Sequence, residues 1–248
     1  MLLALDIGNT NIKSALFSKN DLIQFKVHSD VDAALKYIGT NTFSEAAICS
    51  VNPNSEKNIT EVISTKGLGT FIVNVNHKIN LKIIYKTPDT LGMDRVCSAA
   101  GALDLAKRKS LINKNQYLIT IDFGTATTIN IVTPDGRFLG GLIAPGIKTM
   151  LNSLKEKTAH LPLIESGSYE GIIGDSTNSS ILSGVITSTI GMISEVVNQL
   201  RQKGTQPTPL IFTTGGNAEL IVPHLKQKII FEKDLVLRGL KVIYDLNK

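Results

Sequence analysis

The sequence has few of the features that mark secreted or membrane proteins. It contains two cysteines, Cys49 and Cys97, which lie far apart and show no metal-ligand spacing. A chain of 248 residues needs no disulfide scaffold, so we expect reduced thiols. No uninterrupted apolar run of about 18 residues occurs, and the apolar N-terminal residues reach Asp6 with no basic region before them. These absences predict a cytoplasmic protein with no membrane contact.

The sequence also lacks a basic run. Lys and Arg total 26 against 21 for Asp and Glu, and the net charge of +5 favours anionic ligands without indicating a nucleic-acid partner. The four histidines show neither metal-ligand spacing nor a paired nucleophile, so no histidine mechanism is expected. The chain is 42% hydrophobic and 19% charged, which predicts a folded protein of one large domain or two small ones sharing a cleft.

A pattern near the N-terminus is repeated in the second half. Residues 2–5 are apolar and run into Asp6 and Gly8, after which residues 12–17 and 22–27 predict two further strands in an antiparallel meander. The same order returns 116 residues later, where Asp122 matches Asp6 and Gly124 matches Gly8. An internal duplication explains this offset, and we expect two related domains at residues 1–114 and 115–248.

Three further segments are expected to be helical. Residues 95–109 contain few breakers and end in charged residues, so they predict a helix that closes the first half. Residues 235–246 predict a terminal helix, and residues 181–201 predict a long amphipathic one. The apolar stripe of the long helix consists of Ile186, Ile190, Ile193 and Val197.

Polar loops follow the first strand of each repeat. The loop from Asp6 to Lys13 either aims backbone N–H groups at phosphate oxygens while Asp6 holds a hydrated Mg²⁺, or is simply a tight hairpin. The second copy, which starts at Asp122, favours phosphate binding, because two such loops could hold a nucleotide from both sides. The segment Thr213 to Asn217 adds a glycine pair that either lets a base or ribose approach the backbone or only starts a helix.

Together these motifs resemble those of the type III pantothenate kinases. The resemblance rests on DIGNTNIK, TPDTLGMDR, DFGTATT, GGLIAPG, KTAHLP, STNSSILSG and TTGG in this order, and it runs from residue 6 to about residue 216. It implies an α/β fold of duplicated actin-like, ribonuclease H-like ATPase domains, with mixed sheets flanked by helices and a nucleotide cleft between them. It also implies ATP-dependent phosphorylation of pantothenate to 4'-phosphopantothenate, the first step of coenzyme A synthesis, by a homodimer that needs Mg²⁺ and K⁺ or NH₄⁺.

The resemblance further implies roles for individual residues. Asp94 is the expected catalytic base, and Asp122 is expected to meet the monovalent cation. The residues expected to contact ATP are Asp6, Ile7, Gly8, Asn9, Thr10, Asn11, Ile12, Lys13 and Thr125. The residues expected to contact pantothenate are Tyr85, Gly92, Met93, Asp94, Arg95 and, from the neighbouring subunit, Thr177.

Several of these residues have alternative roles. A carboxylate with an ordinary pKa of about 3.9 is ionised at neutral pH and can accept the proton of an attacking hydroxyl, but Asp94 could also cap the helix that follows it. Arg95 either holds substrate or pairs with Asp94, and Lys13 either neutralises phosphate charge or is solvated. Two other functions also remain open: a non-enzymatic regulatory accessory factor of the same fold, and a kinase of another small alcohol.

Overall fold

The computed structural model describes residues 1–165, 167, 169–202 and 208–248, which form two compact units. Unit 1 comprises Met1–Ser110, Gly136–Leu139 and Asp234–Lys248, and unit 2 comprises Leu111–Asp135 and Gly140–Lys233. The sequence predicts a single boundary between residues 114 and 115. In the structure unit 1 ends at Ser110 and also includes two segments from the second half, the longer of which carries the last helix and packs on elements of unit 1.

Unit 1 contains a sheet of five strands in the order β3-β2-β1-β4-β5. The strands are β1 (Leu2–Ile7), β2 (Ile12–Ser18), β3 (Asp21–His28), β4 (Glu45–Ser50) and β5 (Thr70–Ile72). The first three form the predicted antiparallel meander, while β4 and β5 are parallel to β1. Every residue of β1 is buried, as expected for a strand covered on both faces.

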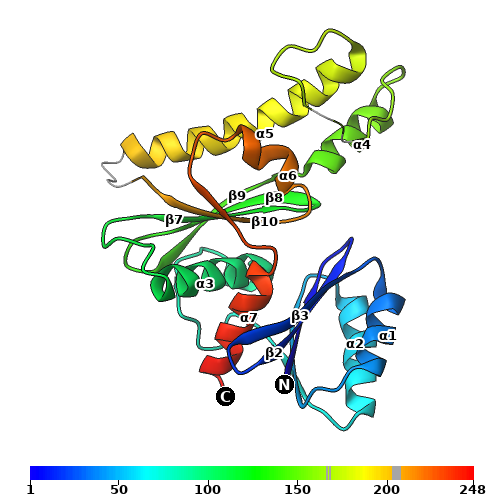
Figure 1. Ribbon diagram of the computed structural model, residues 1–248, viewed down its shortest axis with the longest axis vertical. Helices are drawn as coiled ribbons and strands as arrows, with labels where there is room; N and C mark the ends of the chain where they lie inside the picture. Colours follow the sequence, from blue (N-terminus) through cyan, green and yellow to red (C-terminus); the bar gives the residue numbers. More distant parts are fainter. Residues whose placement is uncertain (166, 168, 203–207) are drawn as a thin grey trace. The chain divides into compact units, whose positions relative to one another are not determined.

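Helices cover both faces of this sheet, as Figure 1 shows. On one face lie α1 (Val31–Thr40) and α2 (Pro53–Thr65), whose apolar residues Ile38, Ile59 and Ile63 are buried in a core with β1 and β4. On the other lies α7 (Leu235–Leu246), which packs along α3 (Met93–Arg108). The predicted helices at residues 95–109 and 235–246 are therefore both present.

The contact between α3 and α7 is unusually close. A Cβ atom added to Gly239 would lie 1.7 Å from the carbonyl oxygen of Cys97, and one added to Gly101 would lie 2.5 Å from the carbonyl oxygen of Leu235. Real Cβ atoms do not approach other atoms so closely, so both positions require glycine. The two helices therefore touch backbone to backbone rather than through side chains.

Unit 2 repeats the strand order of unit 1. Its strands are β7 (Leu118–Phe123), β8 (Ala126–Val132), β9 (Arg137–Pro145), β10 (Leu210–Thr214) and β11 (Ile229–Phe231), in the order β9-β8-β7-β10-β11. As in unit 1, the central pair is antiparallel and the next two strands are parallel to the first. The duplication inferred from Asp6 and Asp122 is thus visible as one topology used twice. The first residues of β9 belong to unit 1, where they pair with β6 (Lys82–Ile83).

The helices of unit 2 are α4 (Ile147–Lys157), α5 (Thr177–Gln202) and the short α6 (Ala218–Ile221); two 3₁₀ turns, Pro88–Thr90 in unit 1 and Val222–His224 in unit 2, complete the elements. Helix α5 begins four residues before its predicted start at Ile181. Ser176 and Ser179 explain this, because the Ser176 hydroxyl accepts the Ser179 N–H at 3.2 Å while the Ser179 hydroxyl accepts the Ser176 N–H at 2.9 Å. Such reciprocal bonds satisfy two of the free N–H groups at a helix start.

The predicted apolar stripe of α5 faces the core of unit 2. Ile186, Ile193 and Val197 are buried there, and Ile190 packs against the same cluster. Among the described residues, α5 is the one helix long and apolar enough to cross a membrane, although a core helix passes the same test. Only 39% of its most apolar stretch is buried in this chain, so a large part of the helix surface is left uncovered.

Candidate active site

The first polar loop is a tight turn between β1 and β2. The Gly8 N–H donates to the carbonyl oxygen of Asn11 at 3.2 Å, and a Cβ on Gly8 would lie 2.9 Å from that oxygen. Asn9, Thr10 and Asn11 are exposed at the tip. Lys13 pairs opposite Asp6, with 3.6 Å between its Nζ and the carboxylate Oδ2. Lys13 is therefore not simply solvated, and the hairpin presents three polar residues beside an ion pair.

Asp94 lies in the first turn of α3. The N-cap of this helix is Gly92, so the alternative in which Asp94 caps the helix is wrong. The Asp94 carboxylate instead folds back along the chain, where its Oδ1 accepts the Arg95 N–H at 2.9 Å. A Cβ on Gly92 would lie 2.5 Å from the same oxygen, so the glycine leaves the room that this carboxylate occupies. A negative charge is favoured at this end of a helix.

Two buried thiols lie close to the carboxylates of unit 1. A hydrogen bond with Cys97, together with burial, raises the pKa of the Cys49 thiol well above its usual value. The charges of Asp6 and Asp94 add to this shift, so both carboxylates lie near enough to act on one thiol. Cys49 pairs in register with Asp6, and Cys97 lies on the helix that begins with Met93. The loop that carries Asp6 and the end of α3 that carries Asp94 therefore share one region of unit 1.

The other predicted substrate residues of unit 1 cluster at the same end of α3. Arg95 is only 6% exposed, and its Cζ lies 5.9 Å from the centre of the Tyr85 ring and 6.0 Å from that of the Phe138 ring. The structure thus brings Tyr85 and Arg95 together, as the motifs suggest. The Met93 side chain is buried in the core. The sequence gives no signal for Phe138 beyond its place after a turn.

The second polar loop, Gly124 and Thr125 between β7 and β8, is two residues shorter than the turn between β1 and β2. The Gly124 N–H donates to the carbonyl oxygen of Ala126 at 3.1 Å, and the Thr125 side chain is exposed. The carbonyl oxygen of Thr125 accepts the Gly146 N–H at 2.9 Å and the Thr149 hydroxyl at 2.7 Å. A Cβ on Gly146 would lie 2.2 Å from the carbonyl oxygen of Gly124. The start of α4 therefore holds this loop in place, a role that the sequence pattern does not reveal.

The glycine pair after β10 has two different environments. Gly215 has a φ of +97°, and a Cβ there would lie 2.5 Å from both Asp122 Oδ1 and the Phe123 nitrogen. A Cβ on Gly216 would meet nothing within 4 Å. Asn217, the last residue of this segment, donates its backbone N–H to the carbonyl oxygen of Phe123 at 3.1 Å. Gly215 thus packs against Asp122, and Gly216 is the position with open space for a ligand.

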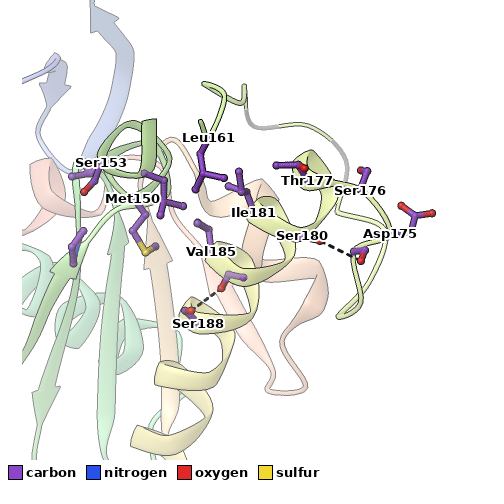
Figure 2. A pocket seen from close by; sticks show the side chains of 15 residues that line it. Met150, Ser153, Leu161, Asp175, Ser176, Thr177, Ser180, Ile181, Val185 and Ser188 are labelled. Carbon is purple, nitrogen blue, oxygen red and sulfur yellow. Dashed lines mark hydrogen bonds between the residues drawn. The ribbon is translucent and has the colours of Figure 1, made fainter. Parts of the chain in front are cut away.

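Thr177 lies at the edge of a groove in unit 2, shown in Figure 2. The groove has a volume of about 1080 Å³ and lies between α4 and α5. Met150 from α4 and Ile181 from α5 supply apolar surface, while Thr177 and neighbouring serines form one end. The exposed face of α5 here carries small residues, including Gly184 and Ser188. This face differs from the buried stripe, so the predicted stripe itself is not available to a second subunit.

Comparison with solved structures defines the class of fold. A protein from Campylobacter jejuni described as a conserved putative Baf family transcriptional activator has a TM-score of 0.62 at 19% identity, covering 98% of this chain and 97% of that one. A polyphosphate/ATP-glucomannokinase from Arthrobacter has a TM-score of 0.52 at 13% identity, covering 100% and 99%. MreB5 of Spiroplasma citri has a TM-score of 0.50 at 13% identity, covering 98% and 96%. The fold is that of the actin-like ATPases and sugar kinases.

Sequence relatives identify the family within this class. A family model described as type III pantothenate kinase matches residues 2–199. The type III pantothenate kinase of Finegoldia magna is 35% identical, covering 100% of this chain and 98% of the relative, and that of Agathobacter rectalis is 30% identical, covering 98% and 96%. The chain belongs to the type III pantothenate kinase family. It is a kinase that transfers phosphate from ATP to pantothenate in coenzyme A synthesis, as the motifs predict.

The two glycines after β10 give a matched test of this part of the site. Gly215→Ala should lower the thermal unfolding midpoint by several degrees, because alanine is strained at positive φ and its Cβ would displace Asp122. Gly216→Ala is the control and should unfold like the wild type. The two variants are compared by circular dichroism melting and by steady-state kinetics. Equal midpoints for both would mean that the close packing of Gly215 on Asp122 is wrong.

Proposed function

We propose that Asp94 is the general base of the kinase. The carboxylate accepts the proton of the primary hydroxyl of pantothenate, the hydroxyl oxygen bonds to the γ-phosphorus, and the bond between that phosphorus and its bridging oxygen breaks to release ADP. The observation that carries this role is the space left by Gly92, which lets the carboxylate lie at the start of α3. Because the transition state is loose, correct positioning of this group matters more than strong basicity.

The neighbouring residues of unit 1 bind pantothenate in this proposal. Tyr85 and Arg95 are in ring contact, and the backbone of Gly92 and Met93 precedes the catalytic carboxylate. Arg95 has the donor fork that suits the carboxylate of pantothenate, since guanidinium and carboxylate groups bond in bidentate pairs. The Asp94 Oδ1 accepts the backbone N–H of Arg95 at 2.9 Å.

ATP is bound by the two polar loops in this proposal. The loop from Asp6 to Lys13 supplies exposed amide and hydroxyl groups at Asn9, Thr10 and Asn11, and Thr125 supplies an exposed hydroxyl. The backbone N–H groups of such turns suit phosphate oxygens. Mg²⁺ fits the same residues, because it is usually held by one or two carboxylates together with the phosphates of the substrate. In the part of the chain that the structure describes, His, Cys, Asp and Glu do not gather in groups of three around a metal position.

Asp122 is the proposed ligand of a monovalent cation. Its half-buried carboxylate begins a loop whose carbonyl oxygens at Phe123, Gly124 and Thr125 already accept hydrogen bonds from neighbouring segments. An all-oxygen set of this kind suits a hard cation such as K⁺ or NH₄⁺ rather than a thiophilic metal. When bound, the cation would offset negative charge of the phosphates.

The enzyme is a homodimer in this proposal, with Thr177 completing the pantothenate site of the other subunit. The support is the large uncovered part of α5 and the groove beside Thr177. The exposed side chains of Ile172 and Ile173 add apolar surface to the same segment of unit 2, and such patches are typical of interfaces between proteins. The small residues Gly184 and Ser188 would let a second helix approach closely.

The proposed location is the cytoplasm. Cys49 and Cys97 are both free and buried, and the hydrogen bond with Cys97 and burial raise the pKa of the Cys49 thiol. A buried pair of reduced thiols is the ordinary state in a reducing compartment. ATP, the phosphoryl donor of the reaction, is used in the same compartment.

Asp94→Asn tests the catalytic base. The variant keeps the size of the side chain and removes the proton acceptor, so kcat should fall by about 10² to 10⁴ while ATP binding is retained. Asp104→Asn is the matched control, because Asp104 lies on the same helix in an ion pair with Arg108. Single-turnover kinetics and ATP titration separate chemistry from binding. If Asp94→Asn kept a near-normal kcat, the carboxylate would have only a structural role.

Replacing KCl with NaCl at constant ionic strength tests the cation. Initial rates should fall at least about tenfold, because the smaller ion fits the oxygen ligands poorly and leaves phosphate charge uncompensated. Asp122→Asn should have a low rate in both salts. Choline chloride serves as the control for ionic strength. Equal rates in potassium, sodium and choline would exclude a specific cation site.

Mixing two inactive variants tests the shared site. In a mixed dimer of Asp94→Asn and Thr177→Trp, one site collects both lesions and the other has neither, so activity should return to about a quarter of wild type after random subunit exchange. The control mixes Asp94→Asn with Asp94→Ala, which leaves no dimer with an intact Asp94, and should remain inactive. A monomer by light scattering, or an inactive mixture after proven exchange, would refute the shared site.

A further inference from the structure

Phe138 is a fully buried residue that the family motifs do not include, and it lies beside the proposed substrate residues of unit 1. Its ring is 6.0 Å from the Arg95 Cζ and 6.4 Å from the Tyr85 ring. The two rings are inclined by 59° to each other. A planar guanidinium cannot stack flat on both, so Arg95 lies in a corner formed by two aromatic rings.

Local structure explains how Phe138 reaches this corner. Gly136 has a φ of +82° and ends the turn before β9. Its carbonyl oxygen accepts the Lys82 N–H at 3.0 Å, and the carbonyl oxygen of Phe138 accepts the Ile84 N–H at 2.9 Å. This parallel pairing of β6 with β9 places Phe138 opposite Ile83, two residues before Tyr85. The strand register therefore places Phe138 beside the strand that leads to Tyr85.

The contact restrains a group that must be oriented to function. An aromatic ring attracts a cation within about 6 Å of its centre, and the attraction grows when the cation is removed from water. Arg95 is 94% buried by its own chain, since its exposed fraction is 6%. A guanidinium recognises a carboxylate through two parallel N–H bonds, which form only when the planes of the two groups are aligned. Fixing the plane of the guanidinium before substrate arrives reduces the entropy lost on binding.

We propose that Phe138 is a positioning residue for substrate recognition: its ring holds the Arg95 guanidinium in the orientation that binds the carboxylate of pantothenate. The proposal rests on the substrate role proposed for Arg95. Phe138 does not itself contact the substrate. Its effect therefore falls on the KM for pantothenate, with kcat and the KM for ATP unchanged.

Fluorinated phenylalanines at position 138 test the electrostatic part of this role. One, two and three ring fluorines weaken the negative face of the ring in steps while changing its size little. The KM for pantothenate should rise with each fluorine and reach about five- to tenfold with three. The same series at Phe212, a fully buried phenylalanine of β10, is the control for steric effects and should leave the KM constant. A KM that does not change across the series at position 138 would overturn the proposal.

Phe138→Leu keeps the position apolar and removes the ring face. It should raise the KM for pantothenate by a similar factor, with kcat within about twofold of wild type. A loss of kcat together with a lower unfolding midpoint in both Phe138→Leu and the fluorine series would mean a purely structural role, which also overturns the proposal.

Arg95→Ala separates the positioning role of Phe138 from the substrate role of Arg95. If this variant raises the KM for pantothenate while the fluorine series is flat, only the positioning role fails. If it leaves the KM unchanged, the substrate role of Arg95 fails as well.

Discussion

Direct contact between backbones at glycine positions is the constraint on which the arrangement of unit 1 depends. Gly101 and Gly239 bring α3 and α7 so close that a methyl group at either position would overlap a backbone atom of the other helix. Helix α3 begins with the segment that carries Asp94 and Arg95. The position of the proposed base is therefore set by a contact two turns further along the helix, with a helix that comes from the end of the chain.

Unit 2 uses the same device around its polar loop. Gly146 lies against the carbonyl oxygens of Gly124 and Thr125, and Gly215 lies against Asp122 and Phe123. The hydrogen bonds from Thr149 and Asn217 then fix the loop in the space that these glycines leave. The motifs DFGTATT, GGLIAPG and TTGG are distant in the sequence, but they pack together around this one loop. Gly146 and Gly215 are needed for the packing of the loop, whereas a Cβ on Gly216 would meet no atom within 4 Å.

The sequence predicted the helices and strands of this fold better than it predicted which elements pack against one another. The repeat of Asp6 and Gly8 at Asp122 and Gly124 revealed the duplication, because turn residues and strand periodicity are local properties. The spacing of apolar residues in 235–246 predicted a helix, but it did not indicate which sheet this helix packs against. The apolar stripe on α5 could pack against a second subunit or, as amphipathic helices more often do, against its own subunit, and it is buried in the core of unit 2. Phe138 could not be found because its neighbours depend on the pairing of β9 with β6 and on a side-chain contact with Arg95, both between segments distant in the sequence.

The placement of α7 in unit 1 has a consequence for how the chain is made. The ribosome synthesises residues 1–110 long before residues 235–246. One face of the unit 1 sheet and the face of α3 around Gly101 therefore emerge before α7 can pack on them. Domains usually fold in order from the N-terminus during synthesis, but this one cannot be completed until the whole of unit 2 has been translated. Until then the first unit has an exposed apolar surface, and a nascent chain that stalls late leaves both the sheet and the helix that carries Asp94 without α7.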